Sequence, residues 1–192
     1  MSVTSLTERL ERARAERQAR RPGELERLCG WPVRALHAAR SADESAPCIR
    51  AVASWATAGG SCILVLSGGP GVGKTAAAAW WALHRPGPVQ FVTAERYVTS
   101  SSYDGSRDAW LHAEALVLDD IGVEYRDAKG NAASALDALV DEFYSCQRPL
   151  VITTNLDKDA FKGRVGPRIV DRVRECGGWR SFANAQSFRG AR

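Results

Sequence analysis

A glycine-rich stretch in the first half of the chain limits its fold more than any other feature. The residues "GGPGVGKT" at 68–75 fit the pattern G-x-x-x-x-G-K-[S/T]. The apolar run "CILVLS" precedes them, and an Ala-rich stretch that favours a helix follows them. A strand, this loop and a helix, in that order, bind the phosphates of a nucleoside triphosphate. A glycine-rich turn with an incidental lysine would explain the loop but not its flanking elements.

Each residue type in this loop has a chemical task. The glycines let the backbone turn tightly with its N–H groups facing inward, and the helix N-terminus adds the positive end of its dipole. We expect Lys74 to reach the β- and γ-phosphates and the Thr75 hydroxyl to hold Mg²⁺. The predicted nucleotide-binding residues are Gly68, Gly69, Pro70, Gly71, Val72, Gly73, Lys74 and Thr75.

Short apolar runs alternate with helical stretches from Cys62 onward. The expected strands are "CILVL", "VQFV", "ALVLD", "PLVITT" and, less distinctly, "RSFAN". Between them lie the Ala-rich segment, the stretch "SALDALVDEFYSC" and an arginine-rich segment. This alternation is typical of a parallel sheet with helices on both faces. The sequence therefore predicts a three-layer α/β/α sandwich.

Composition fits one globular domain with a short appendage. The chain has 192 residues, of which 45% are hydrophobic and 25% charged, values that are ordinary for such a domain. We expect this domain to span 28–192 and a charged helical arm to span 1–27. The arm has little apolar surface, so it is either a solvated helix or a docking segment for a partner.

Several classes of protein are excluded by composition. No run of about 18 apolar residues occurs, and the N-terminus lacks the apolar core of a secretory signal. We therefore expect a cytoplasmic protein without a membrane span. The net charge of +4 permits contact with nucleic acid but does not indicate a strongly basic binding module. Five cysteines without CxxC spacing are predicted to be reduced, mostly structural thiols.

Two carboxylates end one of the expected strands, in "ALVLDDIG" at 115–122. Nucleotides bind at the carboxyl ends of strands in such sheets, so Asp119 is expected to hold Mg²⁺ together with Thr75. Asp120 is then expected to orient or deprotonate the attacking water. Alternatively, Asp120 only caps the loop that follows. Adjacent acids at the end of a buried strand favour the catalytic interpretation, because they are costly without a cation or a water network.

The strand "PLVITTN" at 149–155 also becomes polar at its end. Thr153, Thr154 and Asn155 should lie in the same crevice as the acids. The uncharged amide of Asn155 can hold the attacking water or the γ-phosphate without competing for the metal. A turn before "LDKD" is the alternative for this asparagine, and the neighbouring motifs favour the functional interpretation.

Arginines repeat in "RIVDRVRE" at 168–175. We expect one helix from about 167 to 176, because a proline opens it and two glycines follow it. Arg168 and Arg172 share a face of this helix, and Asp171 can pair with an arginine three residues away for only about 0.2–0.5 kcal/mol. An arginine finger aimed at a neighbouring subunit would instead accelerate hydrolysis by orders of magnitude. Spacing alone does not decide between the two.

Taken in order, these motifs resemble those of the DnaC/IstB-like AAA+ ATPases, which include replicative helicase loaders and transposition helper ATPases. The resemblance extends from about Leu28 to Arg189. Besides "GGPGVGKT" and "RIVDRVRE" it rests on "CGWPVR", "LVLDDIGVE", "RPLVITTNL", which is similar to the sensor-1 strand, and "QSFR". By this resemblance the arginine segment is the box-VII helix, with Arg172 as the finger and Arg168 as a supporting candidate.

The resemblance implies a five-stranded parallel P-loop NTPase core of the ASCE type without a helical lid. It implies an ATP-dependent homo-oligomer in which ATP lies between two subunits. It further implies Mg²⁺-dependent ATP hydrolysis, with Lys74, Asp120, Asn155 and a neighbour's Arg172 as catalytic residues. The expected function is loading or remodelling of a replicative DNA helicase in DNA replication. One alternative is an IstB-like transposition helper, whose partner is a transposase. The others are a small-molecule P-loop kinase and an adaptor that binds ATP without turning it over.

Two features depart from the family. The stretch between "VQFV" and "ALVLD" has only about two dozen residues, where family members insert helices that touch single-stranded DNA. Contact with DNA would there use stacking aromatic side chains beside Arg96 and Arg107, with ordinary packing as the alternative; the aromatic residues are Tyr97, Tyr103 and Trp110. The arm is also smaller than the helicase-docking domain of typical loaders, so the resemblance does not identify the partner.

Overall fold

The central element of the fold is a five-stranded parallel sheet. The computed structural model describes residues 30–58, 62–100, 105–122, 131–176, 178–183 and 185, so the expected arm at 1–27 lies outside the described residues. The strands follow each other across the sheet in the order β2-β3-β4-β1-β5, and every neighbouring pair is parallel. Their bounds are β1 Ile63–Ser67, β2 Gln90–Thr93, β3 Leu116–Ile121, β4 Leu150–Thr154 and β5 Trp179–Ser181. All five expected strands are confirmed.

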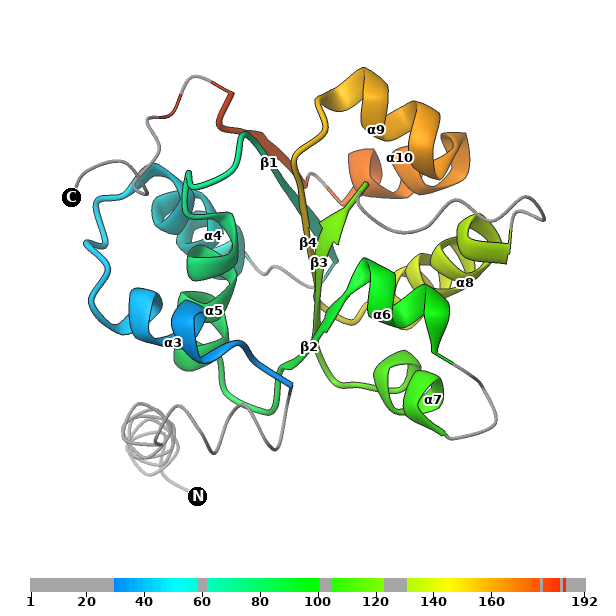
Figure 1. Cartoon of the computed structure of the whole chain (residues 1–192), viewed down its shortest axis with the longest axis horizontal. Helices are drawn as coiled ribbons and strands as arrows, with labels where there is room; N and C mark the ends of the chain where they lie inside the picture. The colour runs from blue at the N-terminus through cyan, green and yellow to red at the C-terminus, as the bar shows by residue number, and fades with distance from the viewer. Residues whose placement is uncertain are drawn as a thin grey trace.

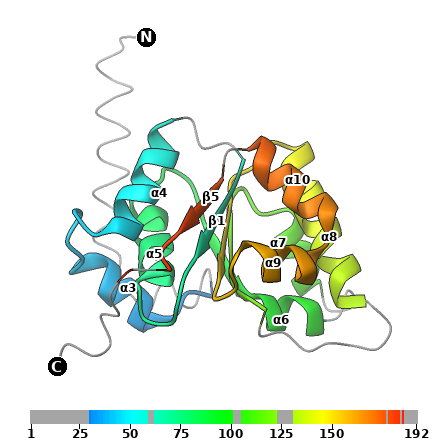
Figure 2. The same ribbon diagram turned by 90° about the horizontal axis from the view of Figure 1, so that it is seen from above.

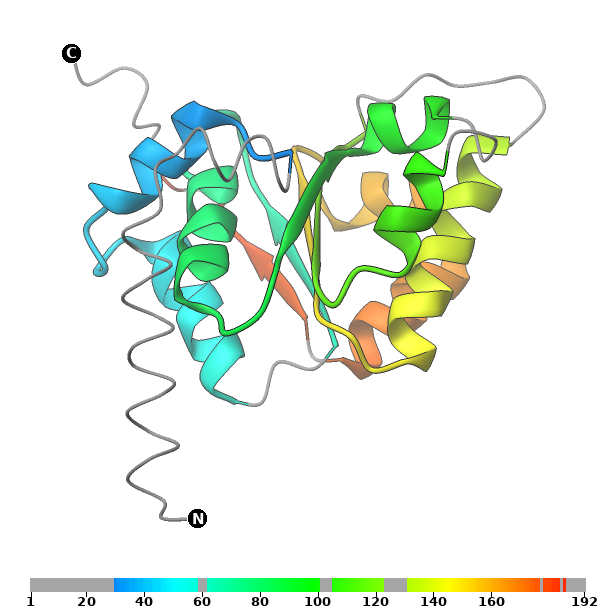
Figure 3. The same cartoon turned by 90° about the horizontal axis from the view of Figure 1, so that it is seen from below.

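Helices cover both faces of this sheet (Figure 1). One face carries α3 (Val33–Arg40), α4 (Pro47–Thr57) and α5 (Lys74–His84). The other carries α6 (Ala94–Thr99), α7 (Ser106–Leu111), α8 (Asn131–Ser145), α9 (Lys158–Val165) and α10 (Pro167–Glu175). Seen from above, β1 and β5 lie between the two groups of helices (Figure 2), and the view from below shows the same three layers (Figure 3). The predicted α/β/α sandwich is confirmed.

The apolar runs are continuous because each strand is buried on both faces. Along β1, Leu64 and Leu66 belong to the core beneath α3, α4 and α5, whereas Ile63 and Val65 belong to the core on the opposite face. All five residues of β1 are buried. Burial of both faces gives parallel strands a uniform rather than an alternating hydrophobic pattern, which is why these runs were recognisable in the sequence.

The strand order places three sequence motifs at one edge of the sheet. β4 lies between β1 and β3, and the carboxyl ends of parallel strands meet at the same edge. The glycine-rich loop follows β1, the two aspartates end β3, and Asn155 follows β4. These three segments are therefore neighbours in space although about 80 residues separate the first from the last.

Two cysteines correct the expectation that the thiols are reduced. Cys62 precedes β1 and Cys176 follows α10, and the structure joins them in a disulfide although 114 residues separate them. Their Cα atoms are 5.3 Å apart, within the usual range for such a bond. Cys48 and Cys146 are free thiols. Sequence spacing did not predict the bond, because the adjacency of Cys62 and Cys176 arises only when β5 pairs with β1.

Gly178 marks a close approach between the start of β5 and β1. A Cβ atom at this position would collide with the backbone of Ile63 and Leu64, which cannot swing aside. We expect Gly178→Ala to lower the free energy of unfolding by about 1–3 kcal/mol, the usual cost of overpacking. Denaturant unfolding followed by circular dichroism measures this change. Gly163→Ala on α9, where an added Cβ meets nothing within 4 Å, is the control, and an equal loss in both variants would contradict the prediction.

In the described part of the chain, no helix is long and apolar enough to cross a bilayer.

Candidate nucleotide-binding site

The glycine-rich loop connects the end of β1 to the start of α5. Two of its glycines have positive backbone φ angles, 85° at Gly71 and 96° at Gly73, a region that other residues rarely adopt. Gly73 is also the N-cap of α5. Val72 is buried, and its carbonyl accepts a hydrogen bond of 3.2 Å from the Cys48 thiol on α4. The loop is thus fixed from behind by α4, and the N-terminus of α5 faces the carboxyl edge of the sheet.

Lys74 has its side chain drawn back into this loop. The residue is only 6% exposed. Its ammonium group donates to the carbonyls of Gly68 and Gly69, at 2.7 and 2.9 Å, and to Oδ1 of Asn155 at 2.8 Å. A buried charge of this kind requires polar partners, and these oxygens provide them. The lysine therefore connects the glycine-rich loop directly to the end of β4.

Asn155 lies at this junction, as its place after β4 requires. It is exposed, and its side-chain oxygen accepts the hydrogen bond from Lys74. The turn that follows is made by other groups, since the Leu156 N–H donates to Thr154 Oγ1 at 3.1 Å and Asp157 caps α9. The side chain of Asn155 thus faces the glycine-rich loop rather than only forming a turn.

Asp119 and Thr75, the two side chains expected to hold a metal ion, are hydrogen-bonded to each other. The Thr75 hydroxyl donates to Asp119 Oδ1 at 3.0 Å. Asp119 is 6% exposed, and burial raises the pKa of its carboxyl group, while hydrogen bonds from Thr153 and Thr75 oppose that rise. Mg²⁺ prefers oxygen ligands, and a cation here would offset the cost of a buried carboxylate. These residues therefore fit a Mg²⁺ ion.

Asp120 has an unusual backbone beside this pair. Its φ angle is +60°, and the pairing of β3 with β4 shifts between Leu118 and Ile121. Asp119 and Asp120 together oppose a single residue of β4, Thr153, which is the arrangement of a β-bulge. Bulges re-aim side chains, and here Asp119 is buried while Asp120 is half-buried. The two adjacent acids thus lie in different environments at the same strand end.

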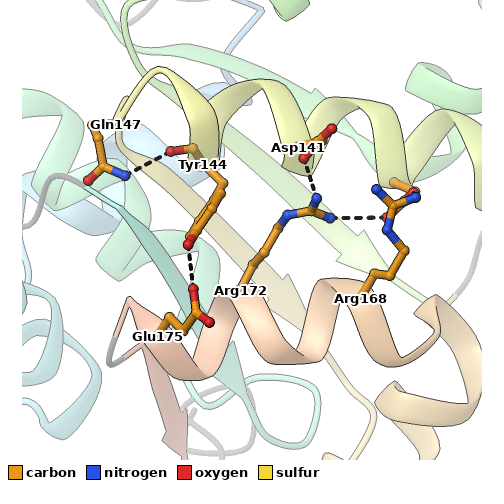
Figure 4. A network of polar contacts seen from close by, with 7 residues as sticks. Asp141, Tyr144, Gln147, Arg168, Arg172 and Glu175 are labelled. Carbon is orange, nitrogen blue, oxygen red and sulfur yellow. Dashed lines mark hydrogen bonds and ion pairs between the residues drawn. The ribbon is translucent and has the colours of Figure 1, made fainter.

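The arginine helix is bound to α8 of the same chain (Figure 4). Arg172 donates to Asp141 and, at 3.4 Å, to Asp137, and its side chain is only 15% exposed. Its guanidinium carbon lies 5.6 Å from the centre of the Tyr144 ring. Arg168 donates to Asp137 at 2.9 Å, with 66% of its side chain exposed. The predicted helix is confirmed, with the bounds Pro167–Glu175.

The partners of these arginines were missed by sequence reasoning. That reasoning considered pairs within the helix, of which the structure contains Arg174 with Asp171 at 3.3 Å. The carboxylates that hold Arg168 and Arg172 are instead about 30 residues earlier in the sequence. Asp137 and Asp141 are four residues apart on α8, so they share one helix face. This spacing was the signal available in the sequence, but only the packing of α8 on α10 shows that the two aspartates face the arginines.

The aromatic residues proposed for stacking on single-stranded DNA are part of the core. Tyr97 is 1% and Trp110 8% exposed. Arg107 donates to the carbonyls of Tyr97, Val98 and Ser100, and Arg96 lies over the Trp110 ring at 5.5 Å. Packing is therefore the correct interpretation of these two rings, because a buried ring cannot stack on a base. Tyr103 and "QSFR" at 186–189 lie outside the described residues.

Comparison with known proteins first gives a sequence relative. No protein-family model matches the chain. The uncharacterized protein YdaV of Escherichia coli K12 is 35% identical over 135 residues. That alignment covers 64% of this chain and 53% of YdaV, so the chain spans about half the length of this curated relative.

Solved structures then show the fold. The DnaI structure matches with a TM-score of 0.61 and 19% identity, covering 80% of this chain and 95% of that one. The DnaC helicase loader matches at 0.54 and 20% identity, covering 68% and 85%. The replication initiator DnaA, bound to AMPPCP and single-stranded DNA, matches at 0.56 and 16% identity, covering 69% and 44%. The chain thus shares the α/β fold of the DnaC and DnaI structures, the fold that its motifs predicted.

Proposed function

We propose that this protein binds ATP with Mg²⁺ and hydrolyses it to ADP and phosphate, as an AAA+ ATPase of the DnaC type. One observation carries the proposal. At a single sheet edge, Lys74 connects the glycine-rich loop to Asn155, and Thr75 is hydrogen-bonded to Asp119. Three segments that are distant in sequence supply these residues: the start of α5, the end of β3 and the residue after β4. A phosphate-binding loop, an acidic metal ligand and an uncharged amide together form the equipment for phosphoryl transfer to water.

Each residue of the site has a proposed task. The backbone of the glycine-rich loop binds the phosphates, and Lys74 exchanges its carbonyl partners for phosphate oxygens. Thr75 and Asp119 hold Mg²⁺, which neutralises phosphate charge when bound. Asp120 accepts a proton from the attacking water, and Asn155 orients that water or the γ-phosphate. Most of the catalysis is therefore positioning and charge stabilisation.

The biological role that fits this activity best is loading or remodelling of a replicative DNA helicase. The fold shared with DnaC and DnaI supports it. A transposition helper that acts on a transposase is the close alternative, because the same core serves both. Direct contact with single-stranded DNA would require a surface other than the buried Tyr97 and Trp110. Purification of a variant that traps ATP, followed by identification of the bound partner, distinguishes helicase from transposase.

A small-molecule P-loop kinase is the rival from another class. A kinase would transfer the γ-phosphate to a metabolite, whereas an ATPase releases it into water. Incubation with γ-labelled ATP and Mg²⁺ tests the proposal, and we expect ADP and free phosphate in equal amounts. Label that appears only on an added nucleoside or metabolite, with no free phosphate, would overturn it in favour of the kinase.

We further propose that the active form is an ATP-dependent homo-oligomer in which Arg172 acts on the ATP of a neighbouring subunit. In the single chain, Asp137 and Asp141 hold this arginine. Its action in trans therefore requires an exchange of these carboxylates for γ-phosphate oxygens, which carry similar negative charge. Arg168 is the alternative, since its side chain is the more exposed of the two.

Mixing two inactive variants tests this role in trans. We expect Arg172→Ala to bind ATP normally but to hydrolyse it roughly 10³-fold more slowly, the lower end of the effect of arginine fingers. Lys74→Ala cannot bind ATP but retains Arg172, so adding it to Arg172→Ala should restore phosphate release. Arg174→Ala, whose side chain is 77% exposed on the same helix, is the control. Failure of the mixture to recover activity would assign Arg172 to the structure of its own subunit.

A further inference from the structure

Thr153 is a residue of the site whose task the sequence did not define. It is fully buried, with 0% exposure, and it lies on β4 opposite the bulge made by Asp119 and Asp120. Its hydroxyl group contacts both residues of that bulge. Thr153 Oγ1 donates to Asp119 Oδ1 at 2.6 Å, and the Asp120 N–H donates to Thr153 Oγ1 at 2.9 Å.

The chemistry of a hydroxyl group fixes the direction of these two hydrogen bonds. A hydroxyl has one proton to donate and two lone pairs that accept. A backbone N–H only donates, so the hydroxyl must accept from Asp120. Its proton is then directed to the ionised Asp119 carboxylate, which only accepts. The Thr153 hydroxyl therefore accepts one hydrogen bond and donates the other, and neither bond can form in the reverse direction while Asp119 is ionised.

These contacts determine the geometry of both acids. Asp119 Oδ1 accepts from Thr153 and from Thr75, while Oδ2 takes neither bond, so one carboxylate oxygen is anchored. Asp120 keeps a left-handed backbone that costs free energy for a residue other than glycine. Its N–H bond to Thr153 helps to maintain that conformation. One side chain thus constrains the metal ligand and the proposed general base at once.

We propose that Thr153 is a positioning residue, whose hydroxyl group holds the Asp119 carboxylate for Mg²⁺ and the Asp120 backbone for its task with water. This inference rests on the proposed ATPase function. It assigns to β4 a second contribution besides Asn155, made from within the sheet. Partners of metal ligands commonly contribute 10- to 100-fold in metal affinity, roughly.

Thr154 provides a matched control in the next position. It is equally buried, with 0% exposure, and its hydroxyl donates to the carbonyl of Ile121 at 2.7 Å. This bond joins the same two strands just beyond the bulge, but it ends on a backbone carbonyl rather than on a carboxylate. Thr154 Oγ1 also accepts from the Leu156 N–H at 3.1 Å. Thr154→Val therefore removes these two hydrogen bonds without removing a contact to either acid.

The experiment compares Thr153→Val and Thr153→Ala with Thr153→Ser and Thr154→Val in the full chain. Each protein is saturated with a non-hydrolysable ATP analogue, and Mg²⁺ is titrated while the unfolding temperature is recorded. Analogue binding in EDTA is measured separately by fluorescence. We expect the variants without the hydroxyl at 153 to need roughly 10- to 100-fold more Mg²⁺ for half of the metal-dependent stabilisation, with binding in EDTA unchanged. Thr153→Ser and Thr154→Val should behave like the wild type.

Three results would overturn the inference while the wild type still binds the analogue with Mg²⁺. The first is an unchanged Mg²⁺ requirement in Thr153→Val and Thr153→Ala. The second is an equal rise in the Mg²⁺ requirement of Thr154→Val. The third is failure of both hydroxyl-free variants at 153 to fold without metal, which would make the role of Thr153 structural. A wild-type protein that shows no stabilisation by the analogue and Mg²⁺ would instead overturn the proposed function, and this inference with it.

Discussion

Lys74→Ala is expected to abolish ATP binding at concentrations that saturate the wild-type protein. The ammonium group of Lys74 is buried against carbonyl and amide oxygens, and we propose that phosphate oxygens replace them. A hydrogen bond to a charged group contributes about 1.5–3 kcal/mol. The loss of two such bonds between Lys74 and the phosphates therefore lowers the affinity for ATP by roughly 100-fold or more. Equilibrium binding of a fluorescent ATP analogue measures the change.

The control for this variant is Lys162→Ala, which removes an exposed lysine on α9. It should bind ATP like the wild type. A thermal melt of Lys74→Ala without nucleotide shows whether the fold persists. A folded Lys74→Ala protein with wild-type affinity would show that the glycine-rich loop is not the nucleotide-binding element.

Asp120→Asn is expected to bind ATP normally and to hydrolyse it about 10²- to 10⁴-fold more slowly, the usual contribution of a general base. Asparagine has almost the same shape and tolerates a left-handed backbone, so the bulge should persist while the proton acceptor is lost. Single-turnover phosphate release, with ATP affinity measured in parallel, separates the two effects.

Asp159→Asn is the matched control, because Asp159 is an exposed carboxylate in the first turn of α9. It should leave phosphate release unchanged. Wild-type hydrolysis by Asp120→Asn would assign the carboxylate to a loop cap, the alternative that its sequence position also permits.

The five strands and the helices α5, α8 and α10 were predictable because their signals are local. Strands that are buried on both faces have continuous apolar sequences. The glycine-rich loop predicts a strand before it and a helix after it. The arginine helix was predicted to within a residue at each end, since Pro167 opens it and Cys176 follows it. Tertiary packing did not need to be known for any of these features.

The relations between elements were not predictable in the same way. The partners of Arg172 lie on α8, and Cys62 meets Cys176 only after β5 has paired with β1. Tyr97 and Trp110 are residue types that can stack on bases, but both are buried in the core. In each case the residue type was informative, and the neighbour that decides its task comes from a distant part of the chain.

The candidate site contains residues that the sequence predicted and one contact that it did not predict. Lys74, Thr75, Asp119 and Asn155 were selected from three separate motifs, and parallel pairing brings them to one edge. The bulge at Asp119 and Asp120 left no mark in the sequence, because a one-residue shift in register changes no residue type. The contribution of Thr153 depends on that shift and was therefore not apparent.

The most direct measurement is a crystal structure of the full chain with a non-hydrolysable ATP analogue and Mg²⁺. The account predicts analogue phosphates on the backbone N–H groups of 71–75, with Lys74 transferred from the Gly68 and Gly69 carbonyls to phosphate oxygens. It also predicts the cation between Thr75 and Asp119. An analogue bound elsewhere on the protein, or a glycine-rich loop that stays without phosphate at saturating analogue, would contradict it.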